Sequence, residues 1–293
     1  MTQKRPSKAV ESPTVGRWRY RVLAVLVLAI VYVVYSQRDA IELSPAQAQD
    51  DSPTVHNRAR ILRRIPHDTN HFVQGLQIVD DVLYEGTGLR GQSAMMKYAF
   101  NARLGTLDLL WRHELASDQF GEGVTVVGDT IYQLTWKAGV VNRYADGVSG
   151  PIQLDPWVNE RDGWGVTWDG QHFITSDGSD TLSFRSMDDF SLVRNLRVHD
   201  SGRPVSRLNE LEFINHKIWA NVYMQPTIVV IDPDTGEVES VVDCRDLIED
   251  ARKSHARIDH LNGIAWDVAS QSLYLTGKRW PWIYEVAVEP SDP

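Results

Sequence analysis

A repeated strand–turn–strand pattern constrains the fold of this chain more than any other feature. Five segments each contain a short apolar or β-branched run, a turn rich in Asp, Gly and Asn, and a second run, which is typical of a β-hairpin. The segments are 75–88, 123–136, 165–178, 211–223 and 263–278. Successive segments start 48, 42, 46 and 52 residues apart, and a period of this length indicates a repeat architecture.

The repeat length predicts an all-β fold, a five-bladed β-propeller. Roughly 40–50 residues form a four-stranded blade, so two further strands should follow each hairpin. Candidate outer strands are 107–114 and 228–232, and one short helix is expected at 244–253. Pairing of a strand at 58–65 with the last strand at 282–288 would close the ring and hide the sheet edges. An open β-sandwich explains the regular spacing less well.

The amino terminus has the layout of a membrane anchor. Basic residues in 1–21 precede an uninterrupted apolar run. We therefore expect a signal-anchor helix at 22–36, a polar tether at 37–56 and one propeller domain at 57–293. Because the positive residues come first, the propeller should lie outside the cytoplasm, on the periplasmic or secreted side. A cleaved signal peptide, cut at the A-x-A string of 46–48, is the alternative.

The charge distribution argues against nucleic acid as a partner. Residues 1–48 carry seven Lys and Arg against three Asp and Glu, so the net charge of −9 leaves −13 on residues 49–293. Nucleic-acid binding needs a basic footprint, which this acidic body lacks. The single cysteine, Cys244, excludes an internal disulfide and any site built from several cysteines. We expect a monomer that contacts the membrane through its amino-terminal segment.

Polar and aromatic residues recur at the same position of every repeat, just before the first strand. Equivalent positions of successive blades converge on the axis of a propeller, so these residues should surround one mouth of the channel. For any single position, hydrogen bonding to the backbone of a blade edge is the alternative. A second set, after the second strands, should lie near the same mouth. The first set is Phe72, Gln74, Phe120, Glu122, Trp164, Asn209, Glu210 and Asn262, and the second includes Trp136, Tyr223 and Lys278.

Several long strings in this region resemble one enzyme family. They occur in order along the chain, at 71–76 (HFVQGL), 83–93 (LYEGTGLRGQS), 120–137 (FGEGVTVVGDTIYQLTWK), 163–170 (GWGVTWDG), 208–222 (LNELEFINHKIWANV) and 261–281 (LNGIAWD to LTGKRWP). They resemble the plant and bacterial type of glutaminyl-peptide cyclotransferase, over about residues 66–285. The resemblance implies a five-bladed propeller that converts the amino-terminal Gln of peptides to pyroglutamate and releases ammonia.

The resemblance also implies nine site residues. The family's catalytic Glu matches Glu122 in the string FGEG, and its Lys matches Lys278 in TGK. Where the family has a third pocket Trp this chain has Tyr223, which keeps an aromatic wall but adds a hydroxyl group. The other substrate-binding residues that the resemblance implies are Phe72, Gln74, Phe120, Trp136, Trp164 and Asn209. It implies neither a metal nor another cofactor.

The reaction suits these residue types. The α-amine of the peptide attacks its own γ-carboxamide carbon, so holding the chain in a near-attack conformation supplies much of the rate. With an amine pKa of about 7.7–8 a base is needed, and Glu122 can take the proton and later give it to the leaving ammonia. Lys278, Gln74 or Asn209 can stabilise the negative charge on the γ-oxygen. Tryptophan side chains would hold the glutaminyl group and exclude water.

Two other functions are compatible with a propeller. A metal-dependent lactonase-like hydrolase would hold a divalent ion in the channel, and a peptide-binding module would bind without catalysis. Ligands for such an ion could come from Glu122, Asn209, Glu210 and Asn262. Activity that a chelator removes would favour the hydrolase, and binding without ammonia release would favour the module.

A histidine pair is a weaker candidate for a metal site. His67 and His71 have the i, i+4 spacing, but Pro66 precedes them and the Glu of a zinc-protease helix is missing. We expect both to be loop residues. Cys244 lies on the short helical stretch and should be a buried small apolar side chain rather than a nucleophile.

Overall fold

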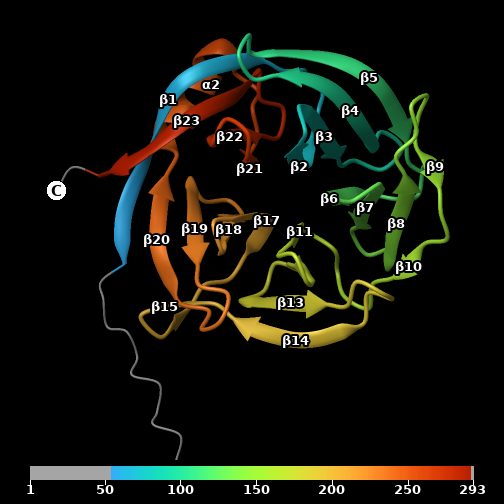
Figure 1. Cartoon of the computed structure of the whole chain (residues 1–293). Coiled ribbons are helices and arrows are strands. Elements are labelled where there is room, and N and C mark those ends of the chain that lie inside the picture. The colour runs from blue at the N-terminus through green and yellow to red at the C-terminus, as the bar shows by residue number, and fades with distance from the viewer. Residues whose placement is uncertain (1–53, 292–293) are drawn as a thin grey trace, which may run out of the picture. The chain divides into compact units, whose positions relative to one another are not determined.

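The computed structural model describes residues 54–291, and these form an all-β, propeller-like body in which sheets surround a central axis (Figure 1). Each of the five predicted hairpins is present and supplies the first two antiparallel strands of its sheet. The predicted signal-anchor helix at 22–36 lies outside the described residues. Within the described residues no helix is long and apolar enough to cross a membrane.

Three of the sheets are built from consecutive strands. The first is β2 (Val73–Val79), β3 (Val82–Thr87), β4 (Ala94–Asn101) and β5 (Thr106–Glu114). The second is β6 (Gly121–Val127), β7 (Thr130–Thr135), β8 (Val140–Ala145) and β10 (Trp157–Val158), with β9 (Ile152–Gln153) also paired to β8. The third is β11 (Val166–Trp168), β12 (Phe173–Thr175), β13 (Thr181–Arg185) and β14 (Leu192–Arg197). A two-stranded ribbon follows, of β15 (His199–Asp200) and β16 (Arg203–Pro204).

The remaining strands form one sheet of eight, which joins the two ends of the chain. One half is β17 (Leu208–Ile214), β18 (Lys217–Val222), β19 (Thr227–Ile231) and β20 (Val238–Asp243). The other half is β21 (Leu261–Asp267), β22 (Ser272–Gly277), β23 (Trp282–Pro290) and β1 (Val55–Pro66). The helix α2 (Arg245–Ser254) connects the two halves, where a short helix was predicted.

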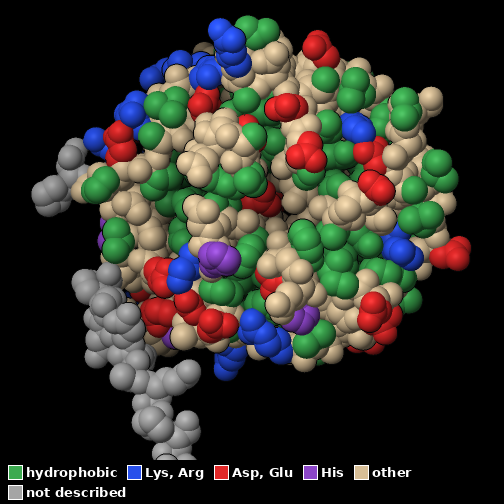
Figure 2. Space-filling model, viewed as in Figure 1, with side chains coloured by type: hydrophobic (Ala, Val, Ile, Leu, Met, Phe, Trp, Pro, Cys, Tyr) green, Lys and Arg blue, Asp and Glu red, His purple; other side chains and the backbone are tan. Residues whose placement is uncertain are grey.

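Strand β1 closes the ring, as the sequence predicted. It pairs antiparallel with β23, from Asn57 opposite Pro290 to Pro66 opposite Trp282, and parallel with the edge of β20. The strand begins at Val55, so its first two residues fall at the end of the range predicted as tether. Basic side chains gather along β1 in Figure 2, and several of them form ion pairs with acidic side chains. The ion pairs are Arg60–Glu289 at 2.8 Å, Arg63–Glu285 at 3.0 Å and Arg64–Asp250 at 2.6 Å.

Two-residue turns fix the register of two hairpins. Asp80 and Asp81, between β2 and β3, have φ angles of 48° and 60°. Asn215 and His216, between β17 and β18, have φ angles of 49° and 63°. Positive φ at both central residues is the type I′ turn, whose twist matches that of the flanking strands. Asp and Asn tolerate this conformation, which explains why the turns could be recognised in the sequence.

The apolar core is divided among the interfaces between neighbouring sheets. Tyr84, Met95 and Trp111 of the first sheet, for example, pack against Val124 and Tyr144 of the second. Similar clusters join the second sheet to the third, the third to the β17–β20 half, and the two halves of the long sheet to each other. A fifth cluster joins the β21–β23 half back to the first sheet. The buried clusters therefore follow one another in a closed circuit.

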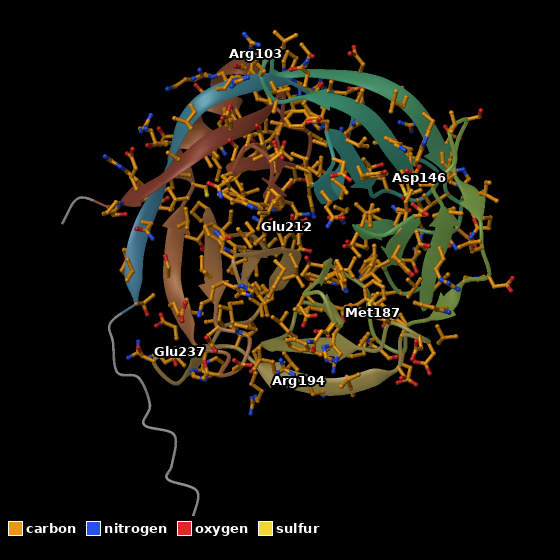
Figure 3. The ribbon with its side chains drawn as sticks, in the orientation of Figure 1. Arg103, Asp146, Met187, Arg194, Glu212 and Glu237 are labelled. Atoms are coloured by element: carbon orange, nitrogen blue, oxygen red, sulfur yellow. The ribbon has the colours of Figure 1, made fainter. Side chains whose placement is uncertain are left out.

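The strands nearest the axis are sheet edges, so their backbone amides need partners from elsewhere. Side chains of neighbouring sheets supply them. The carboxylate of Glu210 accepts hydrogen bonds from the amides of Leu76 at 3.3 Å and Ile264 at 2.9 Å. Glu212, which Figure 3 labels near the centre of the ring, accepts one from the Trp266 amide at 3.2 Å. These contacts tie the innermost strands to one another across the axis.

The closure of the ring predicts where β1 is sensitive to mutation. The side chain of Ile65 is fully buried with Leu76, Phe100 and Ile283 in the cluster that joins the last strands to the first sheet. We expect Ile65→Ala to lower the free energy of unfolding by about 2–5 kcal/mol, because it leaves a cavity at this junction. Urea unfolding of the full chain measures the change.

Leu62→Ala in the same strand is the matched control. Its side chain is 50% exposed, so the expected change is within about 0.5 kcal/mol. Equal losses of stability in the two variants would contradict the view that burial at the ring closure stabilises this fold.

Candidate active site

The innermost strands carry a recurring β-bulge at one end. The pairing register shifts between Val73 and Gly75 in β2, and at the corresponding place in β6, β17 and β21. A bulge leaves residues unpaired, bends the strand and redirects side chains. The side chains within these four bulges include Gln74, Glu122, Asn209 and Asn262, all members of the predicted rim. In four of the five repeats the same local irregularity thus frees polar side chains from the strand pairing.

Glycine allows the bulged strands to approach closely. A Cβ atom at Gly75, Gly123 or Gly165 would lie under 3 Å from backbone atoms of the next innermost strand. The amide of Gly123 instead donates a hydrogen bond to the carbonyl oxygen of Trp164 at 2.7 Å. Any side chain at these positions would push neighbouring sheets apart. The glycines therefore bring the residues beside them into one small space.

All nine predicted site residues line a single cavity of about 220 Å³. Each comes from a bulge, or from a residue next to the end of an innermost or second strand. Although the positions are spread over more than 200 residues of sequence, the fold brings every one of them together. They are Phe72, Gln74, Phe120, Glu122, Trp136, Trp164, Asn209, Tyr223 and Lys278.

The floor of the cavity is polar and buried. Glu122, Gln74, Asn209 and Lys278 are each at most 4% exposed. Glu122 Oε2 and Asn209 Oδ1 have no hydrogen-bond partner among the described residues. Gln74 Oε1 accepts a hydrogen bond from Asn262 Nδ2 at 3.2 Å, which leaves the Gln74 amide group to face the cavity as a donor. Unpartnered buried polar atoms are rare in folded proteins, so this floor is suited to a polar ligand.

Burial controls the ionisation of the two charged groups. Desolvation raises the pKa of Glu122 well above its ordinary value, the Lys278 charge lowers it, and the Asp162 charge adds to the rise. Desolvation also lowers the pKa of Lys278, against the attraction of Glu122 and Asp259. No ion pair within 4.0 Å joins Glu122 to Lys278 in the described structure. Both groups are therefore shifted toward their neutral forms, as a proton-transfer site requires.

One side of the cavity wall is a row of aromatic rings in edge contact. The ring centroids of Phe72 and Phe120 are 6.2 Å apart, and those of Phe120 and Trp136 are 5.7 Å apart. The ammonium group of Lys137 lies 5.2 Å from the Trp136 ring centroid. These rings provide a stiff apolar surface against which a compact side chain can pack.

The other side of the wall is built around Tyr223. Its ring contacts Trp164 at 5.6 Å and His260 at 5.1 Å between centroids. Lys278 Nζ lies 5.1 Å from the Tyr223 centroid and 4.8 Å from that of Phe72, so its cation connects the two sides of the wall. His260 was not predicted, because only the tertiary fold brings the loop before β21 against Tyr223.

Two of the four predicted ligands of a lactonase-like metal site, Glu210 and Asn262, are engaged in other contacts. The carboxylate of Glu210 is bonded to two backbone amides of neighbouring strands, and Asn262 holds Gln74 and the carbonyl oxygen of Val73. Within residues 54–291, the one group of three or more His, Cys, Asp or Glu side chains placed to share a metal ion lies elsewhere, at His67, His71 and Glu85.

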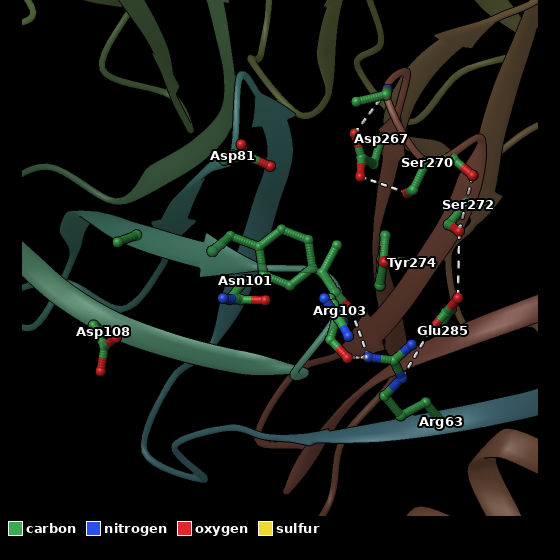
Figure 4. Close-up of a pocket in the computed structure, with 14 residues that line it drawn as sticks. Arg63, Asp81, Asn101, Arg103, Asp108, Asp267, Ser270, Ser272, Tyr274 and Glu285 are labelled. Atoms are coloured by element: carbon green, nitrogen blue, oxygen red, sulfur yellow. Dashed lines mark hydrogen bonds and ion pairs between the residues drawn. The ribbon is translucent and has the colours of Figure 1, made fainter.

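A larger cavity, of about 680 Å³, lies between the first sheet and the β21–β23 half of the long sheet, away from the bulged ends of the strands (Figure 4). Three of its charged side chains, Arg63, Asp267 and Glu285, already have partners in the lining. Arg63 contacts Glu285 at 3.0 Å and the carbonyl oxygen of Ala102, and Ser270 donates to Asp267 at 2.5 Å. None of the nine predicted residues lines it, so the smaller cavity is the better candidate for chemistry.

Comparison with known proteins agrees with the site. The family model for glutamine cyclotransferase matches residues 31–288. A glutaminyl-peptide cyclotransferase of Arabidopsis thaliana is 32% identical over 280 residues, covering 94% of this chain and 85% of the plant protein. The crystal structure of Myxococcus xanthus glutaminyl cyclase matches with a TM-score of 0.73 and 32% identity, over 82% of this chain and all of that one. The chain belongs to the glutamine cyclotransferase family.

Proposed function

We propose that this chain is a glutaminyl-peptide cyclotransferase, which converts the amino-terminal Gln of peptides or proteins to pyroglutamate and releases ammonia. The single observation that carries the proposal is the buried Glu122 carboxylate, with an unpartnered oxygen, at the floor of a small aromatic-walled cavity. Membership of the family and the names of both relatives support the same reaction.

We propose further that the fold is a five-bladed propeller. The five hairpins each begin a run of antiparallel strands, and the long sheet of eight divides into two runs of four at the pairing of β20 with β1. The five apolar clusters would then be the five interfaces between blades. Blade closure by the first and last strands leaves the axis as the common meeting point of the site residues.

The cavity suits an intramolecular attack. A cavity of about 220 Å³ would favour a compact conformation of the glutaminyl residue, which brings its amine toward its γ-carboxamide carbon. The amine nitrogen forms a bond to that carbon and loses a proton to Glu122. The bond from the carbon to the carboxamide nitrogen then breaks, and Glu122 returns the proton to the departing ammonia. No proton is gained or lost overall.

The raised pKa of Glu122 favours this proton transfer. The carboxylate of an exposed Glu is too weak a base for an amine of pKa about 7.7–8, because its own pKa is much lower. Burial raises the pKa of Glu122 and so reduces the difference between the two pKa values. Lys278, Gln74 and Asn209 line the cavity, and a donor among them would stabilise negative charge on the γ-oxygen of the substrate. The aromatic wall excludes water, which favours ring closure over hydrolysis of the carboxamide.

The setting of the enzyme is proposed from the sequence. The basic and apolar amino-terminal segment supports an anchor at 22–36, with the catalytic body on the periplasmic or secreted side of the membrane. We propose that the chain acts there as a monomer on peptide substrates.

The first prediction concerns the base. We expect Glu122→Gln to lower kcat/KM on a Gln-initiated dipeptide by about 10²–10⁴-fold, because Gln cannot accept the amine proton. The fold should be retained, since the replacement is isosteric and removes a buried charge. Ammonia release measures activity, and a melting curve measures the fold.

Glu212→Gln is the matched control for this test. Glu212 is also buried on an innermost strand, but it bonds to the Trp266 amide and does not line the cavity. It should keep near-normal activity. Near-normal turnover by Glu122→Gln would exclude Glu122 as the base. If a chelator abolished wild-type activity while the melting curve stayed unchanged, a metal-dependent reaction would replace the present proposal. Peptide binding without ammonia release would leave only a binding module.

The second prediction concerns pH. Activity should rise as Glu122 loses its proton, at a pH above the ordinary range of a glutamic acid, because desolvation raises its pKa. The Lys278 charge opposes that rise. Removing the charge with Lys278→Met should therefore move the acid limb of the kcat/KM profile to higher pH, whereas Lys278→Arg should leave it near the wild-type position.

Comparing the variants separates the titration of the enzyme group from that of the substrate amine in the kcat/KM profile. The substrate amine also titrates, but its pKa is the same in every assay, so any shift between variants reports on the protein. An acid limb that stays in place in Lys278→Met would show that the lysine charge does not act on the base.

A further inference from the structure

Three metal-binding side chains meet behind one wall of the cavity. His67 and His71 belong to the loop between β1 and β2, as predicted, and Glu85 comes from the middle of β3. His67 Nε2 lies 3.2 Å from Glu85 Oε1, and His71 Nδ1 lies 3.1 Å from the same oxygen. One donor atom from each residue falls within 4.8 Å of the others. The sequence offered no reason to pair Glu85 with the histidines.

The remaining ring nitrogens are held by other groups. His67 Nδ1 lies 3.0 Å from the carbonyl oxygen of Trp280 and donates a hydrogen bond to it, which orients the ring with Nε2 toward Glu85. His71 Nε2 lies 3.7 Å from Asp68 Oδ2, and Nδ1 points toward Glu85. Metal-ligating histidines show this arrangement, in which a carbonyl or carboxylate orients the ring. Nε2 of His67 and Nδ1 of His71 therefore face the Glu85 carboxylate, and a bound cation would take the place of the protons between them.

The cluster is also dry. The side chains of His67, His71 and Glu85 are 2%, 10% and 0% exposed. A buried carboxylate requires a cationic partner, which a protonated imidazole supplies without a metal and a divalent cation would supply in its place. With both imidazoles neutral, the two rings and the carboxylate form a donor set that Zn²⁺ accepts. We propose that His67, His71 and Glu85 form a structural site for a divalent cation, with Zn²⁺ as the preferred ion.

Such an ion would connect three segments that support the cavity. His71 immediately precedes Phe72, and its carbonyl oxygen accepts a hydrogen bond from the Arg279 amide at 2.7 Å. Trp280, which holds His67, lies two residues after Lys278. The ion would thus fasten the loop before β2 and the loop after β22 to strand β3. It lies outside the cavity lining, and the proposed cyclisation takes no step through it.

Cation binding can be tested on the full chain after treatment with a chelator and dialysis. Addition of Zn²⁺ should load one equivalent that depends on His71 and should raise the melting temperature by several degrees. Co²⁺ in place of Zn²⁺ should give visible absorption bands from imidazole ligation. These readouts do not depend on activity, so a negative result would reject the cation site without rejecting the proposed reaction.

His71→Asn provides the decisive comparison. The amide keeps a hydrogen-bonding group near Glu85 but removes the imidazole ligand, so Zn²⁺ affinity should fall by at least about 100-fold and the thermal shift should vanish. His172→Asn is the matched control, because His172 also sits three residues after an aspartate, 3.6 Å from Asp169, and should bind as wild type. Equal Zn²⁺ binding and equal thermal shifts in His71→Asn and wild type would overturn the proposal. So would the absence of Zn²⁺ binding by the wild-type chain.

Discussion

The unpaired backbone amides of the innermost strands are the constraint on which the rest of the structure depends. Each sheet presents an edge to the axis, and a buried amide without a partner costs about as much as a lost hydrogen bond. Side chains on other innermost strands accept hydrogen bonds from these amides. Gln77 accepts the Val126 amide at 2.6 Å, and Glu210 accepts two amides from two other strands. Polar residues in the middle of the molecule are therefore part of its architecture.

The side chains of the candidate site come from the same innermost strands, at the end where the pairing register shifts. A bulge frees one residue per strand from the ladder, and small glycines let the bulged backbones touch. Glu210 and Glu122 lie in corresponding bulges, but the carboxylate of Glu210 is satisfied by amides, whereas Glu122 keeps an oxygen without a partner. One buried carboxylate holds the fold together, and the other is left available for chemistry.

Much of this could be predicted from the sequence, because the relevant information is local or repeated. Hairpin turns, the closing strand and the helix after β20 appeared within one or a few residues of their predicted places. The nine residues of the cavity were recognisable because they occupy equivalent positions of the repeats and match family strings. Less could be predicted for residues whose role is to contact other residues of the two sites. Asn262 was placed on the rim as a candidate metal ligand but was not tied to Gln74, and neither His260 nor Glu85 was tied to its partners, because those contacts join segments with no fixed spacing.

The sequence by itself determined the repeat, the strand-and-turn pattern, the acidic body and the identity of the residues that gather at one mouth of the axis. Each of these follows from backbone preferences and from side-chain type at a fixed period. Only the tertiary structure decided which polar groups are satisfied and which are left free, because that depends on burial and on neighbours from other sheets. It buried Glu122 without a partner, turned the donor face of Gln74 into the cavity and brought Glu85 to His67 and His71.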